Sequence, residues 1–180
     1  MRAISIAALL GALGCGRDFS PVLVALPEEP EEATLTDFLT GDLGDPAAFD
    51  LVIGESVRTD LVLGWDFVFF LPSGGVPEFR LRGQILNEDS DAGLRRASRS
   101  FDAIQEAPDS GYVRDRTVPI AVGDVFFAVS RRDPTFGSLR CRHFAKLEIL
   151  ALDAAESTVT FRHLINPNCE QRSLVPGAEG

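Results

Sequence analysis

The sequence is poor in the residues that most often bind metals or catalyse reactions. Among its 180 residues there are two histidines, His143 and His163, and three cysteines without CxxC spacing. A structural zinc site needs four such ligands, so the sequence does not predict one. It also has no nucleophile elbow, HExxH motif, phosphate-binding loop or dinucleotide-binding fingerprint. We therefore expect a protein that is not an enzyme.

Positive charge is scarce as well. Lysine and arginine together number 17 against 27 acidic residues, the net charge is -10, and Lys146 is the only lysine. Proteins that bind DNA or RNA need a net positive surface to contact phosphates. The composition therefore excludes nucleic acid as an expected partner.

A long hydrophobic run is missing too. The apolar run over residues 3–13 is too short to span a bilayer, which takes about 20 residues. It follows Arg2 and ends at Gly14-Cys15, and this arrangement resembles the lipobox of bacterial lipoproteins. We expect residues 1–14 to be a signal peptide and Cys15 to carry lipid that anchors the protein to the cell membrane or outer membrane. Ordinary cleavage near Gly14, with a free thiol on Cys15, is the alternative, and either cleavage exports the protein.

Export makes the other two cysteines, Cys141 and Cys169, a predicted disulfide, because a pair in an oxidising compartment is normally bonded. Residues 142–152 and 158–165 alternate as two strands around a five-residue loop. If Leu152 pairs with Thr158, the numbers of opposing residues sum to 310, as do 141 and 169. Directly opposed residues have Cβ atoms about 4.5–5.5 Å apart, close to what a disulfide requires.

Helical periodicity is nearly absent, and residues 91–100 are the one weak helix candidate. Short alternating segments bounded by glycine and proline predict an all-β fold, either an antiparallel sandwich or an open barrel, with a C-terminal hairpin closed by the disulfide. We expect an acidic tether over residues 15–33, a single β domain over 34–176 and a short tail over 177–180. The predicted strands before the hairpin are residues 49–53, 56–63, 65–71, 78–86, 117–122 and 124–130.

Two of these segments, 65–71 and 125–129, are apolar on both faces, except for Asp66. Such strands are either covered on both sides or receive a ligand on the second face, and two-sided burial is the more common case. The core is predicted to centre on residues that alternate along the best-supported strands. They are Trp65, Phe67, Phe69, Phe127, Leu147, Ile149 and Phe161.

The order of several segments resembles the HmuY-like haem-binding lipoproteins. The segments are GWDFVFF (64–70), FDAIQEAPDSGYVRD (101–115), VGDVFFAVS (122–130), HFAKLEILAL (143–152) and TVTFRHL (158–164). The resemblance implies a lipid-anchored all-β domain that captures haem at the cell surface. The stretch Pro72-Ser73-Gly74-Gly75 and the two paired cysteines depart from the family pattern.

If the protein binds haem, as the resemblance implies, the iron ligand must come from a short inventory. It comprises His143, His163 and Tyr112, because Met1 leaves with the signal peptide. The hairpin register places both histidines on one face with Cα atoms about 14 Å apart, which favours a single-histidine site over a shared one. Arg95, Arg96 and Arg99 are candidate partners of the haem propionates, and no other metal is expected.

Two alternatives to this haem site remain open. Either histidine can instead be a core residue whose nitrogens are satisfied by hydrogen bonds. The whole protein can instead be a non-catalytic structural or interaction lipoprotein that binds an outer-membrane protein and no small molecule.

Overall fold

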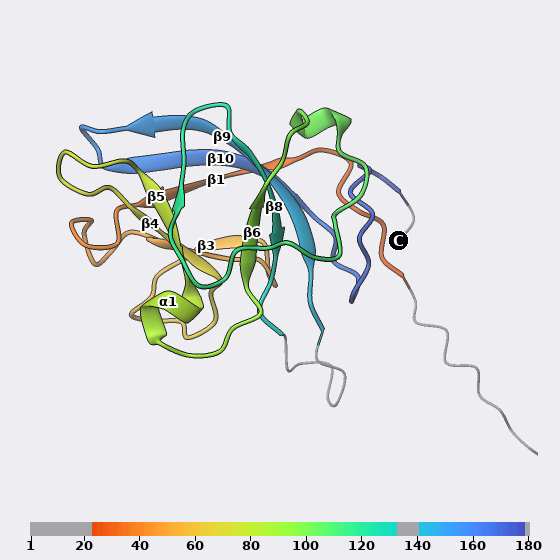
Figure 1. The fold of residues 1–180 in the computed structure, drawn as a ribbon, viewed down its shortest axis with the longest axis horizontal. Helices are drawn as coiled ribbons and strands as arrows, with labels where there is room; N and C mark the ends of the chain where they lie inside the picture. Colours follow the sequence, from red (N-terminus) through yellow and green to blue (C-terminus); the bar gives the residue numbers. More distant parts are fainter. Residues whose placement is uncertain (1–22, 133–140, 179–180) are drawn as a thin grey trace, which may run out of the picture.

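The computed structural model describes residues 23–132 and 141–178, which form two five-stranded antiparallel sheets packed face to face (Figure 1). Sheet A contains, in spatial order, β1 (Glu31–Thr36), β10 (Thr158–Ile165), β9 (Phe144–Asp153), β8 (Val125–Val129) and β6 (Gly93–Arg96). Sheet B contains β3 (Glu55–Val57), β2 (Ala48–Asp50), β4 (Phe67–Phe70), β5 (Glu78–Leu81) and β7 (Val118–Pro119). The predicted all-β sandwich is confirmed.

Aromatic side chains from both sheets meet in the core between them. The ring of Phe161 on β10 lies with its centroid 5.1 Å from that of Phe49 and 6.0 Å from those of Phe67 and Phe79. These rings are at most 1% exposed, so the sandwich is closed over them. Five of the predicted core residues belong to this central cluster: Phe67, Phe69, Leu147, Ile149 and Phe161.

The remaining two predicted core residues lie elsewhere. Trp65 packs on the outer face of sheet B, where Phe38 and Ile85 also cover the sheet. Phe127 is half-buried on the outer face of sheet A, and its neighbour Phe126 points into the central core instead. An all-apolar strand carries no alternation that tells its two faces apart, which is why the prediction chose the wrong phenylalanine. Burial on both faces is confirmed for β4.

The C-terminal hairpin has the predicted register in the half that is remote from its loop. Phe161 pairs with Ile149 and His163 with Leu147, so the residue numbers sum to 310. Nearer the loop, Leu152 pairs with Val159 rather than Thr158, and a register shift between Thr160 and Phe161 absorbs the difference. Beyond the strands, Cys141 and Cys169 form the predicted disulfide, with their Cα atoms 5.1 Å apart.

Two segments form strands where the sequence predicted none. β1 begins at Glu31, before the expected domain boundary at residue 34, because Ala33 and Leu35 reach the core between the sheets. β6 lies within the weak helix candidate 91–100, where Leu94 enters the core and the backbone pairs with β8. Tertiary pairing overrides the local helical preference of this arginine-rich segment.

Four predicted strands end early, β2, β3, β5 and β7, and the differences are largest in β5 and β3. β5 stops at Leu81, and residues 82–86 form the short helix α1 (Arg82–Leu86), which ends at Asn87 in the left-handed conformation with φ 51°. β3 stops at Val57, and the following turn leaves Leu61 and Leu63 70% and 86% exposed. The apolar residues that suggested longer strands are exposed, as Leu61 and Leu63 are, or pack on the outer face of sheet B from the helix, as Ile85 does.

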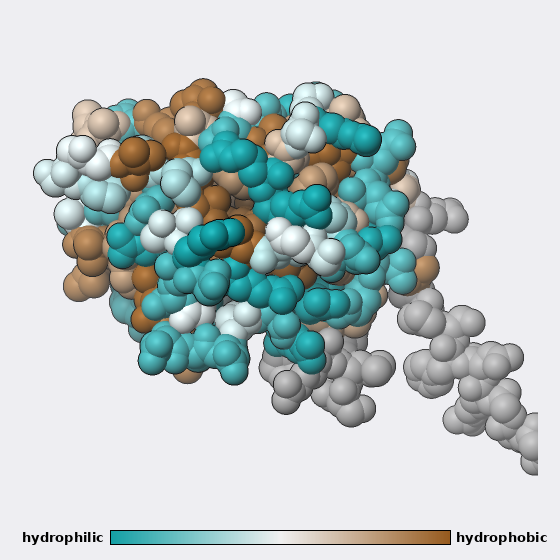
Figure 2. All heavy atoms as spheres, in the orientation of Figure 1, coloured by the Kyte–Doolittle hydropathy of each residue, from teal (hydrophilic) through white to brown (hydrophobic). Residues whose placement is uncertain are grey.

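The surface is mixed rather than uniformly polar. Figure 2 shows a mostly hydrophilic face with separate apolar groups, mainly toward its left end and upper edge. In the part of the chain that the structure describes, no helix is long and apolar enough to cross a membrane.

Candidate functional site

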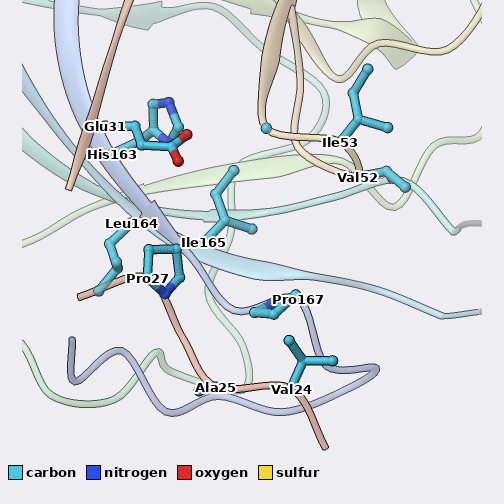
Figure 3. A pocket seen from close by; sticks show the side chains of 11 residues that line it. Val24, Ala25, Pro27, Glu31, Val52, Ile53, His163, Leu164, Ile165 and Pro167 are labelled. Carbon is cyan, nitrogen blue, oxygen red and sulfur yellow. The ribbon is translucent and has the colours of Figure 1, made fainter. Parts of the chain in front are cut away.

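A mostly apolar pocket of about 280 Å³ lies where the N-terminal segment crosses β10 (Figure 3). One wall is a strap, residues 23–27, which passes in front of the end of β10. The opposite wall comes from Val52 and Ile53, which follow β2. Its full lining comprises Val24, Ala25, Pro27, Glu31, Val52, Ile53, Gly54, His163, Leu164, Ile165 and Pro167.

His163 is one of two ionisable side chains in this lining. It is 3% exposed, and its ring lies 4.9 Å from the Phe49 ring. Burial lowers the pKa of its imidazole from 6.5 to about 4, so the ring is neutral at neutral pH. The imidazole makes no hydrogen bond with any described residue. A buried neutral imidazole without a protein partner has its nitrogens available to a ligand.

Glu31 is the other ionisable group of the pocket. It is the cross-strand partner of His163 in the β1–β10 ladder, and Figure 3 shows its carboxylate beside the imidazole. Glu31 is exposed, so its carboxylate marks the solvent side of the pocket. The pocket therefore combines apolar walls with one neutral nitrogen base and one acidic group at its edge.

The structure places His143 in a different setting. It is 4% exposed, its Nδ1 lies 3.2 Å from the carbonyl oxygen of Asn166, and its Nε2 lies 3.8 Å from Sγ of Cys141. Its backbone N–H donates to the hydroxyl of Ser130. Nδ1 donates to a carbonyl oxygen, and Nε2 faces the disulfide sulfur of Cys141, so His143 is an interior histidine held beside the disulfide through Nδ1 and its backbone N–H.

Tyr112, the third candidate iron ligand, is also engaged. Its hydroxyl donates to the carbonyl oxygen of Pro108 at 2.8 Å, and its ring packs 6.3 Å from Phe144. Burial raises the pKa of this phenol above its ordinary value of 10. A tyrosine binds iron as the phenolate, which this environment disfavours.

The predicted propionate-binding arginines lie away from His163. Arg95 and Arg96 are on β6, at the opposite edge of sheet A from β1, three strands from β10. Arg96 is paired with Asp124 and also donates to the carbonyl oxygen of Pro119. Arg95 and Arg99 line a second cavity. The structure therefore does not bring the three arginines together with the His163 pocket.

The disulfide supports the strap indirectly. Asn168 directly precedes Cys169. Its side chain makes two hydrogen bonds with the backbone of Val24, accepting one from the N–H group and donating one to the carbonyl oxygen, each at 2.7 Å. Asn166 accepts hydrogen bonds from the backbone and side-chain nitrogens of Asn168. These contacts fix the strap as a wall of the pocket. Cys15, the predicted lipidation site, lies outside the described residues.

Sequence reasoning missed a buried ionic cluster that joins the two sheets. Arg131, just after β8, contacts both carboxylate oxygens of Asp50 at 2.8 and 3.0 Å and one of Asp66 at 3.0 Å. Asp66 is fully buried and also accepts from the backbone N–H groups of Leu51 and Arg131. Burial raises the pKa of Asp66 from 3.8 to about 6. Asp66 is the one charged residue in the apolar segment 65–71, and this is the feature of the sequence that could have indicated a buried charge.

The single lysine is also a structural group. Lys146 is 1% exposed, and its ammonium donates to the carbonyl oxygens of Phe101 and Ile104 at 3.1 and 3.0 Å. These carbonyls belong to η1 (Phe101–Ala103) and its C-terminal cap. Burial lowers the pKa of Lys146 from its ordinary value. The lysine therefore holds the short helix against the outer face of sheet A.

No cluster of three or more histidine, cysteine or acidic side chains suitable for a metal ion exists within residues 23–132 and 141–178. The chain matches no family model, no curated protein and no solved structure. The His163 pocket is therefore the candidate functional site.

Proposed function

We propose that this protein is an exported, lipid-anchored cell-surface domain that binds a hydrophobic ligand in the His163 pocket. The supporting observation is the buried neutral imidazole, which has no hydrogen-bond partner among the described residues and faces apolar walls. Known small-molecule sites combine apolar linings with a few polar groups in this way and span about 300–1,000 Å³. At about 280 Å³ the pocket suits a compact ligand or one end of a larger one.

Haem is the ligand that the resemblance to HmuY-like proteins implies. Among the three candidate iron ligands, His163 alone has an imidazole or phenol that makes no hydrogen bond within the described chain. A neutral imidazole is the form that binds iron. Haem binding here would therefore be through His163 alone, with the porphyrin extending beyond the pocket.

The test of haem binding is an absorbance titration with haemin. We expect a haem band in the wild type, its loss in His163→Ala and its retention in His143→Ala, provided that both variants keep the wild-type circular dichroism spectrum. No band in the wild type removes haem as the ligand. A band that survives in His163→Ala moves the iron to another residue.

A probe that does not depend on haem tests the hydrophobic site itself. Ile53 lines the pocket and is 56% exposed, so Ile53→Trp should fill the opening without disturbing the core. We expect this variant to reduce the fluorescence gain of N-phenyl-1-naphthylamine at least five-fold. Leu39→Trp, at a 71% exposed position outside the pocket, is the matched control. Equal fluorescence from both variants contradicts binding in this pocket.

Export and anchoring are tested by mass spectrometry of the membrane fraction. We expect a mature chain that begins at Cys15 and carries acyl groups. An intact Met1 or an unmodified Cys15 contradicts the proposed anchor.

The second candidate function is a non-catalytic interaction lipoprotein that binds an outer-membrane protein. The favouring observation is the turn after β3, where three consecutive apolar residues, Leu61, Val62 and Leu63, are 70%, 37% and 86% exposed. Exposed apolar groups of this kind are typical of protein contacts. Crosslinking in the native membrane, compared with a Leu61→Ser/Leu63→Ser variant, tests it: an outer-membrane protein should crosslink to the wild type and not to the variant.

A further inference from the structure

A second cavity, of about 420 Å³, lies on the outer face of sheet A at its β6 edge. Its floor includes Phe127, the cross-strand partner of Arg95, so the ring and the guanidinium lie side by side on this face. The rim includes Arg99, Gln105 and Pro108. β6 and β1 are opposite edges of the sheet, so this cavity is separate from the His163 pocket.

The charge around this cavity is unusual for so acidic a protein. Nine arginines of the described chain form ion pairs with carboxylates. Arg95 and Arg99 form none there, although the protein has 27 acidic residues. Arg95 makes one hydrogen bond, from Nη1 to the carbonyl oxygen of Ser110, and most of its N–H groups remain for another acceptor.

The acid in the lining is already paired and does not cancel this positive charge. Glu106 is the one acid in the lining, and it is paired with Arg172 at 2.5 Å. Beneath the cavity, Lys146 is the cross-strand partner of Phe127, and its ammonium donates to the carbonyl oxygen of Ile104, a lining residue. The cavity is therefore lined by two guanidinium groups that have no carboxylate partner among the described residues, and a buried ammonium lies behind its wall.

We propose that this cavity binds a phosphate group carried on an apolar body. Guanidinium groups present pairs of N–H donors that match the oxygens of a phosphate. Phe127, Ile104 and Pro108 provide apolar surface next to them. Because the overall charge of -10 repels anions, a site that retains one must concentrate cations locally, as this cavity does.

Titration of the chain from residue 16 onward, which includes all of the described fold, tests the proposal. The probes are phenyl phosphate, inorganic phosphate and phenol, in phosphate-free buffer at low salt, followed by calorimetry and by the backbone NMR signals of Ser98, Gln105 and Phe127. We expect phenyl phosphate to bind most tightly, inorganic phosphate at least five-fold more weakly, and phenol without detectable shifts. Binding of phenol equal to that of phenyl phosphate, or no shift with phenyl phosphate, overturns the proposal.

Matched arginine variants locate the site. Arg99→Gln should weaken phenyl phosphate binding at least ten-fold, because it removes one charged pair of donors. Arg116 is exposed and likewise forms no ion pair with the described residues, but it lies outside the cavity, so Arg116→Gln should leave binding unchanged. Equal effects of the two substitutions would show general electrostatic attraction and overturn the proposal. His163→Ala should have no effect, which separates this site from the proposed hydrophobic one.

Vesicles identify the source of the phosphate. Phosphatidic acid vesicles that bind the wild type and lose binding in Arg99→Gln support the proposal with a lipid headgroup as the source. Binding of phenyl phosphate without vesicle binding supports it with a soluble phosphate ester as the source. Vesicle binding that is unchanged in Arg99→Gln, together with no phenyl phosphate binding, overturns it.

Discussion

Two buried ionisable groups, Asp66 and His163, should make the stability of this protein depend on pH in opposite directions. Burial raises the pKa of Asp66 from 3.8 to about 6, so between these values the folded protein binds a proton that the unfolded chain releases. The free energy of unfolding contributed by Asp66 is therefore present at low pH and is lost as pH rises toward 6. At 1.36 kcal/mol per pH unit the contribution is about 3 kcal/mol.

His163 acts in the other sense. Burial lowers its pKa from 6.5 to about 4, so between these values the unfolded chain binds a proton that the folded protein does not. The free energy of unfolding then falls as pH drops from 6.5 to 4, by about 3 kcal/mol. The two contributions nearly cancel in the wild type over this range.

Urea denaturation at pH 4.0, 5.0, 6.0 and 7.0 separates them when the wild type is compared with Asp66→Asn and His163→Gln. The stability advantage of the wild type over Asp66→Asn should shrink by about 3 kcal/mol from pH 4 to 6.5, and its advantage over His163→Gln should grow by a similar amount. The double variant serves as the control, because it lacks both titrations. Differences that stay flat, or that change with the same sign, refute the buried, neutral state assigned to His163 or the buried state of Asp66.

Three further predictions concern packing and cross-links. Phe161→Ala should lower the free energy of unfolding by about 4–5 kcal/mol and Phe127→Ala by about 1–2 kcal/mol, because the first ring is central and the second half-buried; equal losses in urea denaturation would contradict this packing. Lys146→Met should destabilise by about 1–3 kcal/mol, since it leaves two buried carbonyls without a donor, and an unchanged thermal midpoint would contradict that role. Neither Cys141 nor Cys169 should react with a maleimide in denaturant without reductant, and reduction should cost about 3.5 kcal/mol for the closed 29-residue loop.

The fold could be predicted where the sequence alternates and not where it is uniformly apolar or short. In the hairpin over residues 142–165, polar residues such as Lys146, Glu148, Thr160 and Arg162 alternate with apolar ones along part of each strand. This alternation predicts the register and hence the disulfide. β6 is four residues long and arginine-rich, so only its pairing with β8 identifies it as a strand. In the same way, β1 depends on its partner β10, which is remote in sequence.

The sequence predicts which residues could form the candidate site but not how they are arranged in space. Composition reduced the possible iron ligands to His143, His163 and Tyr112. The hydrogen-bond partners that distinguish these residues are remote in sequence: Asn166, the partner of His143, lies 23 residues further along the chain. The partnership of Asp66 with Arg131 spans 65 residues, so the isolated aspartate in an apolar segment indicates a buried charge but does not identify its partner. Sequence patterns report which face a residue occupies, whereas the state of its polar atoms depends on contacts made by the folded chain.

That distinction identifies the site in this molecule. Most of its buried polar side chains are accounted for by protein partners: Asp66 by Arg131 and two backbone N–H groups, Lys146 by two carbonyls, and His143 by Asn166. The buried side-chain atoms without a partner in the described residues are Oε1 of Gln84 and Nε of Arg114. The ring nitrogens of His163 are not among them, so they reach the pocket rather than being sealed in the core. His163 has no partner among the described residues and lines a pocket, which is why its substitution should change ligand binding while substitution of His143 should change mainly stability.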